Sequence, residues 1–161
     1  MKPAALKVQE ALVALGTART LIELPVSART SREAAAALGV SVAQIAKSLI
    51  FTSNGNPVLV IASGANRVDE RKLERLTEGT VRKADPETVK QATGFAIGGV
   101  PPLAHATPLP TYVDRTLLQY EVIYPAGGVP ECVFAIPPQE LIRATGGRVV
   151  DIRQDPSGGQ A

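Results

Sequence analysis

The 161-residue sequence contains one cysteine, one histidine and no tryptophan. A disulfide or a cysteine-based zinc site within one chain requires at least two cysteines, so both are excluded. A serine–histidine or cysteine–histidine relay would have to use His105. That residue lies in a proline-rich stretch, and we expect it to be a loop residue without chemistry. Cys132 lies in an apolar run, which predicts a buried thiol. We expect neither a metal nor a cofactor.

Long apolar runs are also absent, and none approaches the ~18 residues that a membrane span requires. The N-terminus lacks the apolar segment of a signal peptide, so we expect a cytoplasmic protein with no membrane partner. Lysine and arginine total 17 against 15 acidic residues. The densest basic cluster, residues 67–75, is interleaved with acids, which is typical of a solvated helix face. The charge permits a nucleic-acid partner but does not demand one.

The length fits a single domain, and 45% hydrophobic with 20% charged residues is ordinary for a globular fold. No internal repeat or interdomain linker interrupts the chain. The last residues are rich in proline, glycine and serine, which favours disorder at a terminus. We therefore expect one domain over residues 1–154 and a disordered tail over residues 155–161.

Apolar spacing, caps and turn residues predict the secondary structure. Helices are predicted over residues 3–15, 30–39, 41–47, 68–76, 85–94 and 140–144. Strands are predicted over residues 21–26, 48–52, 57–62, 80–83, 95–97, 112–114, 121–124, 132–136 and 148–152. The clearest signal is Asn54-Gly55, which predicts a tight hairpin between the second and third of these strands.

That hairpin forces an antiparallel pair, so the chain cannot be a strict alternation of parallel strands and helices. The second hairpin strand is continuously apolar over residues 58–61, which predicts burial on both of its faces. The pattern favours an α/β fold with a mixed, barrel-like sheet flanked by helices.

Three features could carry chemistry. Lys47 lies next to a strand that is predicted to be buried, residues 98–102 form a Gly-Gly-Val-Pro-Pro turn, and residues 126–128 form an Ala-Gly-Gly turn. Glycine lets main chain approach a ligand closely, and rigid turns with one lysine would suit a small anionic or ester substrate. Plainer interpretations remain open: an exposed lysine, ordinary turns, and a capping role for Asp114 at a strand end.

Several motifs occur in order over most of the chain: REAA at 32–35, LGV at 38–40, IAKSLIF at 45–51, VLVI at 58–61, RKADP at 82–86, TG at 93–94, GGVPP at 98–102 and VD at 113–114. Together they resemble the YbaK/ProX aminoacyl-tRNA deacylase family. Its members are freestanding relatives of the editing domain inserted in bacterial prolyl-tRNA synthetase.

The resemblance implies a mixed, barrel-like sheet with outer helices and a trans-editing hydrolase. Its substrate would be mischarged tRNA-Pro, carrying cysteine or another small amino acid, and prolyl-tRNA synthetase would be a possible partner. The family's essential lysine corresponds to Lys47. The residues implied to bind substrate are Gly98, Gly99, Val100, Pro101, Pro102, Asp114, Gly127 and Gly128.

In this scheme Lys47 is a fixed cation, and amides of the Gly98 and Gly127 loops hold the ester carbonyl. The nucleophile is water or a group of the substrate. Ser48 departs from the asparagine that follows the lysine in alanine-specific members, and Pro125 and Val129 depart from the polar residues of cysteine-specific members. Two alternatives stay open: a non-catalytic module that binds aminoacyl-tRNA or the synthetase, and a small-molecule-binding domain.

Overall fold

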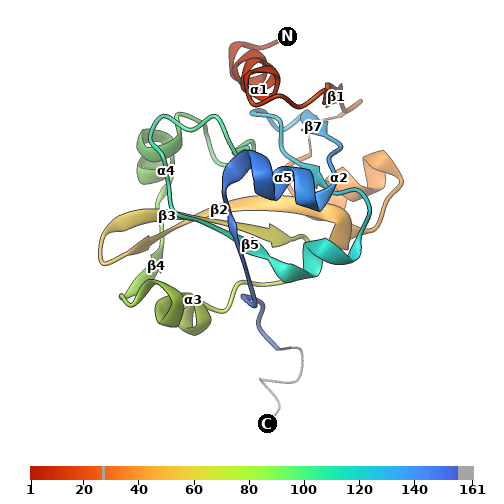
Figure 1. Ribbon diagram of the computed structural model, residues 1–161. Helices are drawn as coiled ribbons and strands as arrows, with labels where there is room; N and C mark the ends of the chain where they lie inside the picture. The colour runs from red at the N-terminus through yellow and green to blue at the C-terminus, as the bar shows by residue number, and fades with distance from the viewer. Residues whose placement is uncertain (27, 156–161) are drawn as a thin grey trace.

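The computed structural model describes residues 1–26 and 28–155 (Figure 1). The helices are α1 Pro3–Ala14, α2 Ser31–Leu38, α3 Glu70–Thr77, α4 Pro86–Thr93 and α5 Pro138–Thr145, with the 3₁₀ helices η1 Val42–Gln44 and η2 Arg115–Gln119. The strands are β1 Leu21–Glu23, β2 Ile45–Ser53, β3 Asn56–Ser63, β4 Val81–Lys83, β5 Thr111–Asp114, β6 Tyr124–Pro125, β7 Cys132–Phe134 and β8 Arg148–Val150. Residues 156–161 of the predicted tail lie outside the described residues, whereas Asp155 is described and lies 3.6 Å from Lys72.

The main sheet has the strand order β4-β2-β3-β5-β8, and β6 pairs with β2 beside this path. β2 runs antiparallel to β3 and β4, while the β2–β6, β3–β5 and β5–β8 pairs are parallel. The predicted mixed α/β fold with flanking helices is confirmed. Across the described part of the chain the sheet is open rather than closed into a barrel, and β1 and β7 form a separate two-stranded sheet.

The β2–β3 hairpin forms where the Asn54-Gly55 turn predicted it. Asn54 and Gly55 have φ angles of 49° and 84°, the pair of positive values that a two-residue hairpin turn requires. Pro57 pairs with Thr52 in the ladder, one residue beyond the closing pair, where its missing N–H breaks no hydrogen bond to β2. Val58 to Ser63 of β3 are all buried, which confirms that this strand is covered on both faces.

Local caps start and end the helices as predicted. Thr30 and Glu33 form a reciprocal capping box at the start of α2, and Gly39 ends that helix in the left-handed conformation. At α4, the Asp85 carboxylate accepts a hydrogen bond from the Thr88 amide, with Pro86 in the first turn. These signals need only neighbouring residues, which explains why the sequence is sufficient to predict them.

Two predicted elements are wrong. The capping box of Ser41 and Gln44 opens only the short η1 helix, and Ile45 already belongs to β2, where it pairs with Tyr124 of β6. Residues 95–97 form no strand. They lead into a turn in which the Gly99 amide donates to the Ala96 carbonyl. At Ile45 the long-range pairing with β6 outweighs the local capping pattern, whereas residues 95–97 follow the local turn at Gly98 and Gly99.

Different helices pack their apolar side chains against the two faces of the sheet. Figure 1 shows α1 and α3 on opposite sides of the sheet. Leu59 and Ile61 of β3 belong to the cluster that also contains residues of α1, α4 and α5. Val60 and Ala62 belong to a second cluster that contains Leu73 of α3. Within the described residues, no helix is long and apolar enough to cross a membrane.

Candidate functional site

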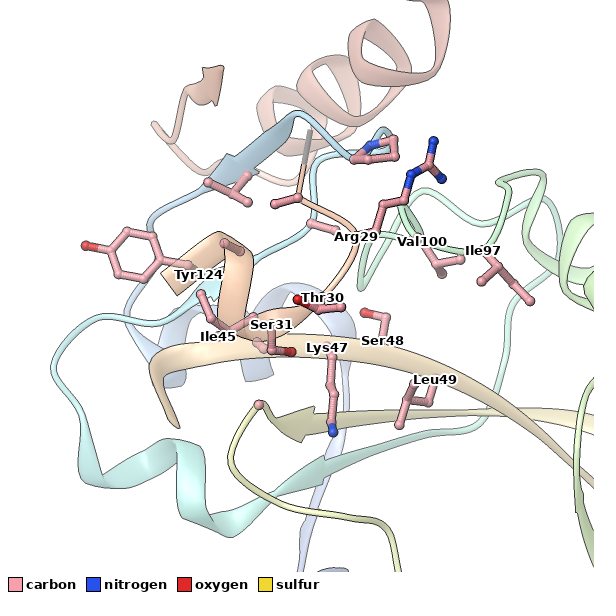
Figure 2. A pocket seen from close by; sticks show the side chains of 18 of the residues that line it. Arg29, Thr30, Ser31, Ile45, Lys47, Ser48, Leu49, Ile97, Val100 and Tyr124 are labelled. Atoms are coloured by element: carbon pink, nitrogen blue, oxygen red, sulfur yellow. The ribbon is translucent and has the colours of Figure 1, made fainter. Parts of the chain in front are cut away.

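A pocket of about 770 Å³ opens along β2 (Figure 2). Its lining includes residues 45–51 of β2, the start of α2, Lys83 of β4, two residues of the glycine–proline loop and the turn between β6 and β7. The volume lies in the ordinary range for a small-molecule site. The pocket therefore gathers segments that are distant in sequence around one strand.

An interruption in strand pairing creates this pocket. One edge of β2 pairs with β3 along its whole length. The other edge pairs with β6 only at residues 45–46 and with β4 only at residues 51–53. Within the described residues, 47–50 have no strand partner on that edge, where the Ile50 carbonyl accepts from the Ala84 amide, and the pocket follows the gap. At residues 47–50 the pocket reaches both faces of the sheet, because Lys47 and Ser48 both line it. Figure 2 shows their side chains leaving β2 in opposite directions.

Lys47 lies within β2, opposite Ala62 of β3, and its half-buried side chain lines the pocket. Among the described residues no hydrogen bond or ion pair holds its ammonium group. Burial lowers the pKa of Lys47, and the positive charge of Arg67 lowers it further, while the Asp114 carboxylate acts in the opposite direction. Lys47 is thus an unpaired cation that the protein partly dehydrates.

Asp114 does not line the pocket. It is 1% exposed, and its Oδ2 accepts hydrogen bonds from the Ser63 amide at 3.0 Å and from Asn66 Nδ2 at 2.9 Å. Its Oδ1 accepts from the Thr116 amide and caps η2. Asp114 therefore stabilises the turn that follows β3 and the start of η2. This is the capping role that the sequence left open.

Of the glycine–proline loop, Gly98 and Val100 line the pocket, whereas Gly99, Pro101 and Pro102 do not. Gly98 has a φ of 99°, a conformation that favours glycine. Pro101 and Pro102 are buried. Two of the five loop residues that were predicted to bind substrate therefore form a wall of the pocket, and the other three do not line it.

The second glycine turn supports that wall from behind. Gly127 and Gly128 do not line the pocket, although Ala126 and Val129 on either side of them do. The Gly127 amide donates to the Cys132 carbonyl at 2.8 Å, so it is not available to an ester carbonyl. A Cβ on Gly128 would lie 2.7 Å from the Ala4 carbonyl oxygen of α1. Both glycines serve close main-chain packing.

His105 has a role that the sequence did not predict. Its Nε2 lies 2.7 Å from the Pro101 carbonyl oxygen, and a carbonyl can only accept, so Nε2 carries the proton. Burial lowers the pKa of His105, which favours the neutral ring. His105 therefore ties down the glycine–proline loop. The one available clue was its place four residues after Pro101.

Cys132 is buried and lines the pocket, as its apolar surroundings predicted. Burial raises the pKa of its thiol, and the nearby carboxylates of Glu23 and Glu131 raise it further. The protonated thiol is a poor nucleophile. Within the described residues, no group of three or more histidine, cysteine, aspartate or glutamate side chains gathers to hold a metal ion.

The charges of the pocket are all of one sign. In the described structure its charged lining residues are Arg29, Arg32, Lys47 and Lys83, and no described aspartate or glutamate lines it. Other basic residues do form ion pairs, such as Arg19 with Glu140 and Lys72 with Asp151. None of the four pocket cations has such a partner in the part of the chain that the structure describes. The arrangement suits a polyanionic ligand.

Residues 26–144 match the aminoacyl-tRNA editing domain family, and the chain belongs to that family. A crystal structure of a proposed trans-editing enzyme for prolyl tRNA synthetase superimposes with a TM-score of 0.92 and is 46% identical, covering 96% of this chain and 99% of that one. The Bacillus subtilis (strain 168) protein YwhH is 33% identical over 135 residues, which are 83% of this chain and 86% of that protein.

Two further relatives connect the family to tRNA. The proline–tRNA ligase of Solidesulfovibrio magneticus is 36% identical over 90 residues, which are 55% of this chain but only 15% of the ligase. EbsC of Enterococcus faecalis, named as a candidate Cys-tRNA(Pro)/Cys-tRNA(Cys) deacylase, is 24% identical over 125 residues, 76% of each chain. This chain therefore matches a small part of the ligases and most of the freestanding relatives.

Proposed function

We propose that this protein is a trans-editing deacylase that hydrolyses the ester between a wrong amino acid and the 3′-terminal adenosine of tRNA. The substrate we assign to it is tRNA-Pro carrying cysteine or another small amino acid. The family and the relatives described above support the reaction. The single structural observation that carries the proposal is a pocket whose charged lining residues are all cations.

An aminoacyl ester needs little further activation. Water adds to the carbonyl carbon, the bond to the ribose oxygen breaks, and that oxygen takes a proton from the attacking water. No serine–histidine relay is required, and His105 is bonded to Pro101 instead. Lys47 acts as a fixed cation that holds the terminal nucleotide, because a dehydrated ammonium binds an anion more strongly than an exposed one.

The apolar part of the pocket, formed by Val100, Val129, Cys132 and Val133, is where we place the amino-acid side chain. It suits a small, uncharged group. We assign Arg29, Arg32 and Lys83 to contacts with phosphates of the single-stranded acceptor end. Few phosphates lie there, which fits the modest net charge of the protein.

We assign the editing domain to residues 1–154, beyond the segment that matches the family. Val8 and Leu12 of α1 are part of the main core, and Ile152 is fully buried in the second cluster. We place the activity in the cytoplasm, where aminoacyl-tRNA is made, with prolyl-tRNA synthetase as a possible partner.

The test is a panel of tRNA-Pro charged with cysteine, alanine, serine, threonine or proline. We expect release of at least one non-cognate amino acid, with prolyl-tRNA left intact, and loss of that release in the Lys47→Ala variant. If no ester is cleaved at micromolar protein while charged tRNA still binds, the protein is a non-catalytic binding module. If Lys47→Ala is fully active, the assigned site is wrong even though the reaction is right.

A further inference from the structure

Ser48 lines the pocket and has polar groups without a partner among the described residues. It belongs to the gap in β2, residues 47–50, where neither β4 nor β6 pairs with the strand. Its Oγ is buried and has no hydrogen-bond partner within the described structure. A buried polar atom without a partner is uncommon in folded proteins and marks this stretch of β2 as one where the protein leaves polar groups unpaired.

The direction of the Ser48 main chain follows from the ladder. The Ile45 carbonyl accepts from Gly64, on the β3 side, and odd-numbered residues of β2 share that direction because the pattern repeats every two residues. The Ile50 carbonyl accepts from Ala84, on the opposite edge. The N–H and C=O of Ser48, two residues before Ile50, therefore point away from β3 and into the gap.

The gap has room for one residue-sized ligand. Four strand residues span about 13 Å. β6 closes one end of this stretch, and the Ala84 amide bonded to the Ile50 carbonyl closes the other. An added peptide strand would collide with these neighbours. A single aminoacyl group fits, because it carries one hydrogen-bond donor and one acceptor at the spacing of a strand residue.

We propose that the main chain of Ser48 binds the aminoacyl group of the substrate as a one-residue antiparallel strand. The Ser48 N–H donates to the ester carbonyl oxygen, and the Ser48 C=O accepts from the α-ammonium group. This inference rests on the proposed deacylase function. It adds a specific main-chain contact to the ester carbonyl oxygen and the α-ammonium group, which are common to all aminoacyl esters.

The contact also contributes to the reaction. When water adds to the carbonyl carbon, negative charge develops on the oxygen that the Ser48 N–H already holds, so the hydrogen bond strengthens in the transition state. Gly127 cannot supply this donor, because its amide is bonded to Cys132. The intermediate collapses by breaking the bond to the ribose oxygen, which takes the proton that the water loses.

A pair of variants separates the main chain from the hydroxyl. Ser48→Ala keeps the N–H, whereas Ser48→Pro removes both the hydroxyl and the N–H, at an edge position where no β2–β3 bond is broken. We expect Ser48→Pro to have a kcat roughly 10²–10³-fold below that of Ser48→Ala. Equal rates for the two folded variants would overturn the proposal.

A second measurement does not depend on how Ser48→Pro folds. The wild-type protein, labelled with ¹⁵N, is titrated with 3′-alanylamido-3′-deoxyadenosine, whose amide resists hydrolysis. We expect the Ser48 amide resonance to shift and its exchange with solvent to slow, while the Leu59 amide, which donates to the Pro110 carbonyl outside the pocket, changes little. Binding that leaves the Ser48 amide unchanged would overturn the proposal.

The ligand can also be varied. The matching compound with a hydroxyl in place of the α-ammonium group should bind more weakly, because a neutral donor makes a weaker hydrogen bond than a charged one. Equal binding would argue against the Ser48 C=O contact. A wild-type protein that cleaves no charged tRNA refutes the deacylase function, whereas activity with unchanged Ser48 signals refutes only this inference.

Discussion

Gly99 packs directly against the main chain of Gly128. A Cβ on Gly99 would lie 2.8 Å from the Gly128 carbonyl oxygen and 2.7 Å from the Val129 Cα. The two glycine turns that the sequence singled out are therefore in contact, one forming a wall of the pocket and the other supporting it. An alanine at Gly99 has to push them apart.

Gly99→Ala is thus expected to lower the free energy of unfolding by about 1–3 kcal/mol, the range for overpacking, and to reduce deacylation of folded protein. Thermal unfolding and rates measured well below the transition test this. The matched control is Gly147→Ala, whose Cβ would lie 2.6 Å from Val113 Cγ2, away from the pocket. It should lose stability and keep activity. Equal activity losses would show that the Gly99 contact has no specific effect on the site.

Lys47→Ala is expected to lower kcat/KM by about 10²-fold or more, because the substrate loses a cation held in a partly dehydrated site. Its stability should stay within about 1 kcal/mol of wild type, since no described partner is left unpaired. Lys47→Arg keeps the charge and should keep measurable activity. A Lys47→Ala variant that is unfolded would contradict the view that this lysine serves binding rather than folding.

The pH dependence of ligand binding should report the lowered pKa of Lys47. Burial and then Arg67 favour its neutral form. As pH rises, binding of uncharged tRNA, which keeps the terminal phosphates and has no α-ammonium group, should therefore weaken at a lower pH than an ordinary lysine would give. Arg67→Gln removes a positive neighbour and raises the pKa of Lys47, so this weakening should move to higher pH. Arg71→Gln, on the exposed side of α3, is the control and should not move it.

His105→Leu should lower kcat/KM about five- to tenfold, because the Pro101 carbonyl loses a hydrogen bond worth about 1 kcal/mol and the loop with Gly98 and Val100 becomes less ordered. His105→Gln places an amide donor near the position of Nε2 and should recover most of the activity. Steady-state kinetics of both variants separate the effect of the hydrogen-bond donor at position 105 from the effect of the imidazole ring. Equal defects in the two would show that the ring packing, and not the hydrogen bond, is what matters.

The salt dependence of tRNA binding should locate the phosphate-binding side chains. Replacing Arg29 and Arg32 by glutamine should reduce the slope of log affinity against log salt by about 0.7 for each phosphate that the variant no longer neutralises. Filter binding or fluorescence titration at several salt concentrations measures this. Arg148→Gln, an exposed β8 residue outside the pocket, should leave the slope unchanged. A smaller slope in that control would place the RNA elsewhere.

Local sequence signals predicted much of the scaffold. The capping residues Thr30 and Asp85 and the Asn54-Gly55 turn each act on residues within one turn of the chain, so their effect can be read without knowing the rest of the structure. The same holds for the continuously apolar segment of β3. The prediction of a helix reaching Lys47 was wrong because β2 begins at Ile45, which pairs with β6 from far along the chain.

The amino-acid order by itself determined the mixed α/β class, the family motifs and Lys47 as a candidate. Only the tertiary structure decided that Lys47 and Ser48 both belong to β2, that Gly127 is already bonded and that His105 holds a loop. It also decided that β2 has an unpaired edge. The reason is that strand pairing is long-range: the gap at residues 47–50 exists only because β4 and β6 dock on either side of it, and no local propensity encodes where such distant strands stop.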